Sequence, residues 1–206
     1  MGNGTRPVAR TLHIVCAVAG IPLADQVVAL RRWRLADAEE IVACIDGDPE
    51  IARWLDLVPQ PYTLEDARAY LGGLGEEAFA VTDAADGRVL GSIGVRWNET
   101  RDVGEIGYWL RADARRGGRM TRALVLISRW ALARNGVARL QLRADVENLA
   151  SRRVAEQAGY TLEGVLRSAH WNARLGRRQD WVLYSLLPGE LVSGTQPPSP
   201  PRPATP

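Results

Sequence analysis

Residues 114–123, with the sequence ARRGGRMTRA, combine two adjacent glycines with four arginines. The segment follows a predicted strand and precedes a run whose apolar residues recur at helical spacing. The first turn of a helix leaves N–H groups unpaired, and glycine lets the backbone approach an anion bound there. Guanidinium groups add donors that suit phosphate oxygens. The pattern predicts a phosphate-binding loop, and a basic turn without a ligand is the plainer alternative.

The absence of lysine from the sequence narrows the kind of phosphate ligand. A P-loop requires a lysine followed by Ser or Thr, and a Schiff-base enzyme also requires a lysine, so both are excluded. The dinucleotide fingerprint GxGxxG is not present in the loop. A second glycine cluster at 72–75 ends a predicted helix and does not follow a strand. The pyrophosphate of another cofactor remains as the candidate ligand.

Composition excludes several other classes of protein. The net charge is +2 and 46% of residues are hydrophobic, values typical of a soluble globular domain, so we expect no nucleic-acid partner. Two cysteines and two histidines are too few for a disulfide framework or a zinc site of about four ligands. We therefore expect no metal and a reducing, cytoplasmic compartment. No segment approaches the roughly 20 apolar residues of a membrane span, so no membrane association is expected.

Hydrophobic periodicity and turn residues predict the elements that position the loop. Strands are predicted at 26–33, 78–83, 89–98, 102–110, 138–145, 160–171 and 180–187. Helices are predicted at 35–47, 48–55, 63–75, 119–134 and 148–159. This order predicts an α/β (mixed α+β) fold, with a mostly antiparallel sheet of six to seven strands and helices on both faces.

A single domain at residues 26–190 accounts for these elements. Residues 1–25 are predicted to be an N-terminal extension, and their short apolar run resembles a signal peptide only weakly. Residues 191–206 are rich in proline and are predicted to form a disordered tail.

Two motifs resemble the GNAT superfamily of N-acetyltransferases. Residues 104–124 are similar to its acetyl-CoA loop, whose signature is Arg/Gln-x-x-Gly-x-Gly/Ala. Arg115 and Gly118 match this signature. Met120 replaces the usual small residue, and Arg116-Gly117 is inverted against the common Arg-Gly-x-Gly.

The second motif, at residues 142–167, resembles the ribosomal-protein N-terminal acetyltransferase (RimJ/RimL-like) branch. The positions that match its pattern are Glu147, Asn148, Ser151, Val154, Glu156, Gly159 and Tyr160. The resemblance extends over about residues 27–188 and implies a single GNAT-like domain that transfers acetyl from acetyl-CoA directly to an amine.

The resemblance also implies a set of cofactor-binding residues. The strand before the loop would bind the pantetheine through Tyr108, Trp109, Leu110 and Arg111. The loop would bind the pyrophosphate through Arg115, Arg116, Gly117, Gly118, Arg119, Met120 and Thr121. Asn148 and Ser151 would contact the cofactor, although capping of the helix that starts there is a complete structural explanation for Asn148.

Direct transfer to an amine requires a base for the ammonium proton, stabilisation of an oxyanion and a proton for the thiolate. The resemblance implies Glu105 as the general base, acting through water; a solvated or ion-paired strand residue is the alternative. Ser151 is the candidate acid at the sulfur, and Tyr160 on the next strand is the alternative. His170 could be a second base, although a lone histidine on a hairpin usually is not.

The preferred acceptor is a protein amine, either an N-terminal α-amine or a lysine. A small-molecule amine such as an antibiotic or a polyamine is the second class of acceptor. A non-catalytic acyl-CoA-binding module is the alternative to an enzyme. The family often dimerises, which allows a homodimer.

Overall fold

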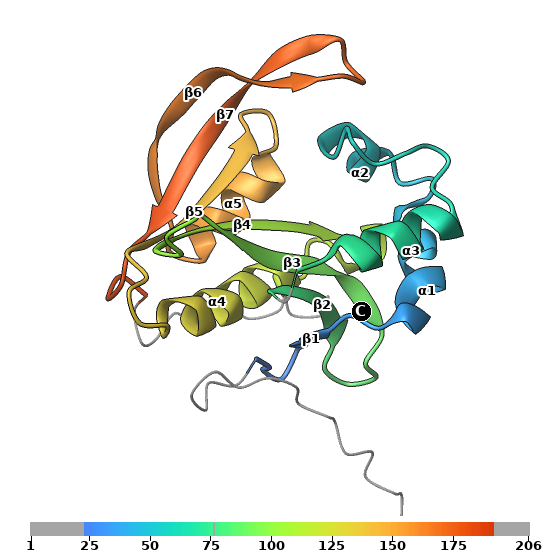
Figure 1. Ribbon diagram of the computed structural model, residues 1–206, viewed down its shortest axis with the longest axis horizontal. Helices are drawn as coiled ribbons and strands as arrows, with labels where there is room; N and C mark the ends of the chain where they lie inside the picture. The colour runs from blue at the N-terminus through green and yellow to red at the C-terminus, as the bar shows by residue number, and fades with distance from the viewer. Residues whose placement is uncertain (1–22, 76, 192–206) are drawn as a thin grey trace, which may run out of the picture.

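The computed structural model describes residues 23–75 and 77–191. Their strands form one seven-stranded sheet in the order β1-β2-β3-β4-β5-β7-β6 (Figure 1). The strands are β1 (Val28–Arg32), β2 (Ala78–Asp83), β3 (Val89–Trp97), β4 (Val103–Leu110), β5 (Arg139–Asp145), β6 (Thr161–Asn172) and β7 (Arg177–Leu186). Neighbouring strands in this sheet are antiparallel except for β4 and β5, which are parallel.

Helices cover both faces of the sheet, which confirms the predicted fold class (Figure 1). They are α1 (Ala38–Ile45), α2 (Pro49–Trp54), α3 (Leu64–Gly73), α4 (Arg119–Leu132) and α5 (Leu149–Gln157). Side-chain caps start three of them: Asp48 accepts the N–H groups of Glu50 and Ile51 in α2, Thr63 forms a capping box with Asp66 in α3, and Asn148 accepts the N–H of Ser151 in α5. The predicted extension and tail lie outside the described residues, apart from 23–25 and 191.

Alternation along β4 divides the interior into two clusters. Ile106 belongs to the larger cluster, which lies between the sheet and the helices α4 and α5. Trp109 belongs to the smaller cluster, which it shares with residues of α1, α2 and α3. Successive side chains of a strand point to opposite faces, so the odd-numbered residues of β4 face α1 to α3 and the even-numbered residues face α4.

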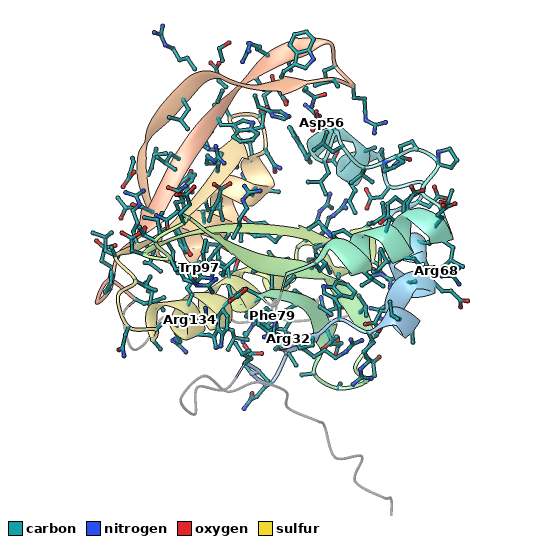
Figure 2. All side chains as sticks on the ribbon, viewed as in Figure 1. Arg32, Asp56, Arg68, Phe79, Trp97 and Arg134 are labelled. Atoms are coloured by element: carbon teal, nitrogen blue, oxygen red, sulfur yellow. The ribbon has the colours of Figure 1, made fainter. Side chains whose placement is uncertain are left out.

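The β6–β7 hairpin reaches across to the segment that follows α2 (Figure 1). The Asp56 carboxylate, labelled in Figure 2, lies 3.2 Å from His170 Nε2 and accepts the N–H of Ala173 at 3.1 Å. Arg174 Nη2 donates to the Val58 carbonyl oxygen at 2.7 Å. These contacts hold the hairpin against the α2–α3 connection, and they give His170 a structural partner.

Two glycines of β3 and β4 test the register of this strand pair. A Cβ atom at Gly91 would lie 2.2 Å from the Trp109 carbonyl oxygen, whereas a Cβ at Gly107 would meet no atom within 4 Å. We predict that Gly91→Ala destabilises the fold by roughly 1–3 kcal/mol, as overpacking does. Gly107→Ala should be neutral or stabilising by up to about 1 kcal/mol. Urea unfolding measures both, and equal midpoints for the two variants would contradict the register.

The thiol of Cys44 is buried in the smaller cluster. Burial raises the pKa of this thiol to about 11. Only the thiolate reacts with disulfide reagents, and an ordinary thiol is mostly ionised at about pH 9. We predict that Cys44 stays unreactive at that pH in a folded Cys16→Ser variant and reacts fully in urea. The reaction with a disulfide reagent would be followed by absorbance. Fast reaction of the folded variant would contradict the prediction, because it would show that the thiol is accessible and ionised.

Candidate active site

The parallel pairing of β4 with β5 lasts for three residues only. Residues 103–105 pair with 139–141, after which β4 continues along β3 and β5 continues along β7. Within the described chain, residues 106–110 therefore have no paired strand on the β5 side; we call this segment the unpaired edge of β4. A strand edge offers backbone N–H and C=O groups to an extended ligand.

The predicted phosphate loop connects this edge to α4. Gly118 is the N-cap residue of α4 and has a φ of 68°, a left-handed conformation that glycine adopts without strain. No side chain in the described residues caps this helix. The amides of the first turn are therefore available to an anion next to the exposed Arg116 and Gly117.

Met120 does not obstruct the loop. Its side chain is 4% exposed and packs into the larger cluster, so only its backbone belongs to the loop surface. Thr121 is also buried, and its hydroxyl donates to Gln157 Oε1 at 3.3 Å, which joins α4 to α5. The larger side chain of Met120, where the signature has a small residue, is therefore accommodated in the core and does not narrow the loop.

Arg116 occupies the position where the common Arg-Gly-x-Gly motif has glycine. Its φ is 67°, in the left-handed region that costs a non-glycine residue roughly 1–2 kcal/mol. The inversion of Arg116 and Gly117 therefore leaves the loop in the conformation that a glycine would favour. It also places an exposed guanidinium at the mouth of the loop.

The other arginines of the loop are held by carboxylates. Arg115 donates from Nε to the Leu110 carbonyl oxygen at 3.0 Å and forms an ion pair with Asp48, the N-cap of α2. It therefore joins the loop to α2. Arg119 Nη2 lies 3.9 Å from Asp83 Oδ2, and its Nε is buried without a partner among the described residues.

The remaining residues at the end of β4 have mostly structural contacts. The Arg111 N–H donates to the Leu90 carbonyl oxygen at 2.8 Å, and its Nε pairs with Asp113 at 2.7 Å. The Trp109 side chain is buried and stacks on Trp33 with ring centroids 6.4 Å apart. Trp109 and Leu110 thus contribute to the unpaired edge through their backbones.

Tyr108 and Ser151 meet beside the unpaired edge. The Tyr108 hydroxyl lies 2.9 Å from Ser151 Oγ and donates to the Ser151 carbonyl oxygen at 3.2 Å. Burial raises the pKa of Tyr108 above its usual value, so the phenol keeps its proton at neutral pH. The two hydroxyls form a protonated pair on the α4 face of the sheet.

Asn148 caps α5, as its position at the helix start allows. Its Oδ1 accepts the N–H of Ser151 at 3.0 Å, and no described group accepts from its Nδ2. Capping by the oxygen therefore leaves the nitrogen as a donor, so the two explanations of Asn148 are compatible. Tyr160 lies elsewhere: it is buried in the larger cluster, with its hydroxyl 2.8 Å from Ser128 Oγ.

The sequence predicts Tyr108 as one of the residues of the strand that bind the pantetheine, and it gives no role to the Tyr108 hydroxyl. Glu105 and Tyr108 are three residues apart on one strand, so their side chains point to opposite faces of the sheet. That alternation was the available signal that Tyr108 and Glu105 serve different sides.

Glu105 lies where β4 and β5 diverge, in a network of ion pairs. Arg143 Nη2 is 2.7 Å from both carboxylate oxygens, Gln141 Nε2 donates at 3.3 Å, and Arg96 Nη2 donates at 3.1 Å. The Arg143 guanidinium also lies 5.1 Å from the centroid of the Trp181 ring. In this structure Glu105 is therefore an ion-paired strand residue, which is the alternative to a general base given above.

A groove of about 760 Å³ lies on the α3 face of the sheet. Gly94 and Gly107 pair directly at its floor, so the backbone there carries no side chains. The wall nearer α3 includes Tyr70 and Trp109, and Glu105 lies on the other side of the glycine pair. The groove and the Tyr108–Ser151 pair therefore approach the same segment of β4 from opposite faces.

Glu77 and its partners form one end of this groove. Arg101 Nη2 and Arg134 Nη1 donate to Glu77 Oε1 at 2.7 and 3.1 Å. The Arg134 guanidinium also lies 5.5 Å from the ring of Trp97, and Figure 2 labels both residues. Burial raises the pKa of Glu77, but the two guanidinium groups outweigh it and hold the pKa below its usual value. This end is a structural ion-pair cluster.

Within residues 23–75 and 77–191, no three histidine, cysteine or acidic side chains gather as metal ligands do. None of the helices in these ranges has the length and apolar character of a membrane span.

Comparisons with known proteins identify the family of this fold. Residues 28–161 match the family model described as "Acetyltransferase (GNAT) domain". A comparison with curated protein sequences finds no match.

Solved structures with a similar fold include a GNAT acetyltransferase from Bacillus anthracis (18% identity, 80% of this chain and 97% of that chain, TM-score 0.72). RimL, a ribosomal L7/L12 α-N-protein acetyltransferase solved with coenzyme A, is 20% identical over 81% of this chain and 97% of its own, with a TM-score of 0.67. The microcin C7 self-immunity acetyltransferase MccE, solved with acetyl-CoA and AMP, is 22% identical over 79% and 93%, with a TM-score of 0.65.

The family match covers the sheet from β1 through the phosphate loop and α5 to the start of β6. The unpaired edge of β4, the glycine-capped start of α4 and the groove all lie within the matched residues. The chain belongs to the GNAT family of acetyltransferases, which use acetyl-CoA as the acetyl donor.

Proposed function

We propose that this enzyme acetylates a protein amine, either an N-terminal α-amine or a lysine, and that it belongs to the RimJ/RimL-like branch; the similar structure RimL is named as an α-N-protein acetyltransferase. The observation that carries the proposal is the glycine-floored groove, which meets β4 opposite the Tyr108–Ser151 pair. Bare backbone at Gly94 and Gly107 gives an amine on an extended chain access to the strand.

The charges of the groove favour an acceptor with one ammonium group. Three glutamates and two arginines line it, and Glu77 and Glu105 are already paired with guanidinium groups. A polyamine or an aminoglycoside carries several ammonium groups and would need several unpaired carboxylates. A peptide terminus or a lysine needs only one.

Acetyl-CoA would supply the acetyl group as a thioester, and the residues described above fit it. The amides at the start of α4, with Arg116, would hold the pyrophosphate. The unpaired edge of β4 would bind the pantetheine arm through its backbone, and Asn148 Nδ2 would add a donor. A backbone N–H of that edge would stabilise the oxyanion that develops on the acetyl carbonyl.

The two faces of β4 would divide the proton transfers. Glu105 would hold the ammonium and take its proton through a water molecule, which frees the nitrogen lone pair to form the new C–N bond. The Tyr108–Ser151 pair would donate a proton to the sulfur as the C–S bond breaks. The proton lost on one face is thus matched by a proton gained on the other.

The buried thiol of Cys44 fits a reducing compartment and supports a cytoplasmic location.

A homodimer is also proposed, and the exposed apolar side chains Leu162, Val165 and Leu166 of the edge strand β6 support it.

A thiol-release screen tests the proposed function. Acetyl-CoA would be offered with peptides that have free N-termini, with N-terminally blocked lysine peptides, and with polyamines and aminoglycosides. We expect turnover with one of the peptide sets and little with the multiply charged amines. Preference for a small polyamine would contradict the protein acceptor, and CoA binding without turnover on any amine would contradict the catalytic role.

The proton donor can be identified by removing single hydroxyls. We predict that Tyr108→Phe lowers kcat by about 10²-fold and that Ser151→Ala lowers it less, both with little change in CoA affinity. Tyr160→Phe is the matched control, because it removes a buried hydroxyl bonded to Ser128, and it should lower stability while kcat stays near wild type. A loss of kcat confined to Tyr160→Phe would reverse the assignment.

The role of Glu105 predicts a particular pH dependence. We predict that Glu105→Gln lowers kcat/KM for the acceptor by about 10²-fold at neutral pH. The deficit should shrink as the pH rises past the acceptor's own pKa, about 8 for an N-terminal amine, because the amine then arrives neutral. Glu163→Gln removes a glutamate that pairs with Arg139 on β5 and serves as the control. Parallel pH profiles for wild type and Glu105→Gln would exclude Glu105 as the base.

A further inference from the structure

Arg96 makes an exposed ion pair with Glu105 inside the groove. The β3–β4 register places the two residues directly opposite each other, next to the Gly94–Gly107 pair. Arg96 Nη2 lies 3.1 Å from Glu105 Oε1. The Arg96 side chain is 78% exposed, the highest value among the arginines in ion pairs of the described chain. Arg96 therefore reaches the carboxylate from the solvent side.

Glu105 does not depend on Arg96 for its position. Arg143 contacts both carboxylate oxygens at 2.7 Å, and Gln141 adds a third donor from the same strand. Arg143 is itself packed over the Trp181 ring. Removing Arg96 would therefore leave the Glu105 carboxylate in the same position.

The Arg96 contact is weak enough to be exchanged. An exposed ion pair contributes roughly 0–1 kcal/mol, since water and salt screen it. An acceptor amine is mostly an ammonium ion at neutral pH and needs a carboxylate when it leaves water. Of the three glutamates that line the groove, Glu99 is exposed to solvent, Glu77 is held by two guanidinium groups, and Glu105 is approached from the groove by Arg96.

We propose that Arg96 is a placeholder cation: its guanidinium occupies the site on Glu105 that the ammonium of the acceptor takes, and it leaves when the acceptor binds. This inference rests on the proposed acetylation of an amine. It makes Arg96 a specificity-determining residue. The ammonium of the acceptor takes over the contact that Arg96 makes with the carboxylate, and the displaced arginine then repels a second positive charge on the acceptor.

The test compares Arg96→Gln with Arg101→Gln. Arg101 also lines the groove and is 57% exposed, but it pairs with Glu77, so its removal changes the groove's charge equally without touching Glu105. KM for a cationic peptide acceptor, kcat and KM for acetyl-CoA would be measured for each variant. Calorimetric titration of the peptide into the CoA-loaded enzyme gives its affinity without turnover, and urea midpoints check folding.

We expect Arg96→Gln to lower the acceptor KM and Kd by about two- to fivefold, the range that an exposed ion pair of up to 1 kcal/mol allows. The KM for acetyl-CoA should not change, and Arg101→Gln should change the acceptor KM less. Added salt should raise the acceptor KM more steeply in Arg96→Gln, since wild type exchanges one screened ion pair for another.

Two results would overturn the proposal that Arg96 occupies the ammonium site. A higher KM in Arg96→Gln would mean that Arg96 binds the acceptor directly, for instance through a carboxylate of the acceptor. An unchanged KM and Kd would mean that Arg96 and the acceptor do not compete. Failure of the proposed function looks different, because no amine would then be acetylated by any variant and no peptide would bind; that outcome overturns both proposals.

Discussion

The parallel ladder between β4 and β5 ends after three residues, and the active-site architecture depends on that break. Beyond Glu105, β4 continues along β3 and β5 continues along β7, and the two strands separate. The unpaired edge of β4 runs on to Leu110, and the loop that follows ends in a helix start with free amides. An extended ligand with a phosphate at one end fits such a path, and the family match identifies that ligand class.

The period-two alternation of β4 assigns opposite chemistry to its two faces. Tyr108 points toward α5, where burial keeps its phenol protonated beside Ser151. Glu105 points into the groove, where Arg143 donates to both carboxylate oxygens and orients the group. In the proposed mechanism a proton donor and a proton acceptor therefore approach one strand from opposite faces, which suits an enzyme that must deprotonate one substrate and protonate the leaving group of the other. The Gly94–Gly107 pair keeps the backbone between them uncovered on the groove side.

Local sequence signals predicted most of the fold and the glycine-containing turn that starts α4, because both depend on short-range patterns. Periodicity and turn residues gave the strands and helices, and Asp48, Thr63 and Asn148 cap helices where their types predicted a start. The direction of the Met120 side chain was also predictable in principle from the apolar stripe of α4 that it shares with Leu124. The partners of Glu105 were not predictable, since Arg143 and Gln141 come from a strand whose register only the folded sheet defines. The groove floor was not predictable for the same reason, because Gly94 and Gly107 lie opposite each other only through the register of β3 and β4.

Backbone amide hydrogen exchange along β4, with and without coenzyme A, tests the central claim that the unpaired edge is the binding surface. If the account is correct, coenzyme A slows exchange of the amides within residues 106–110 that do not donate to β3, together with the amides at the start of α4. The amides of residues 103–105, which already lie in the β4–β5 ladder, should exchange at the same rate in both states. Protection that appears only elsewhere, with residues 106–110 unchanged, would contradict the account.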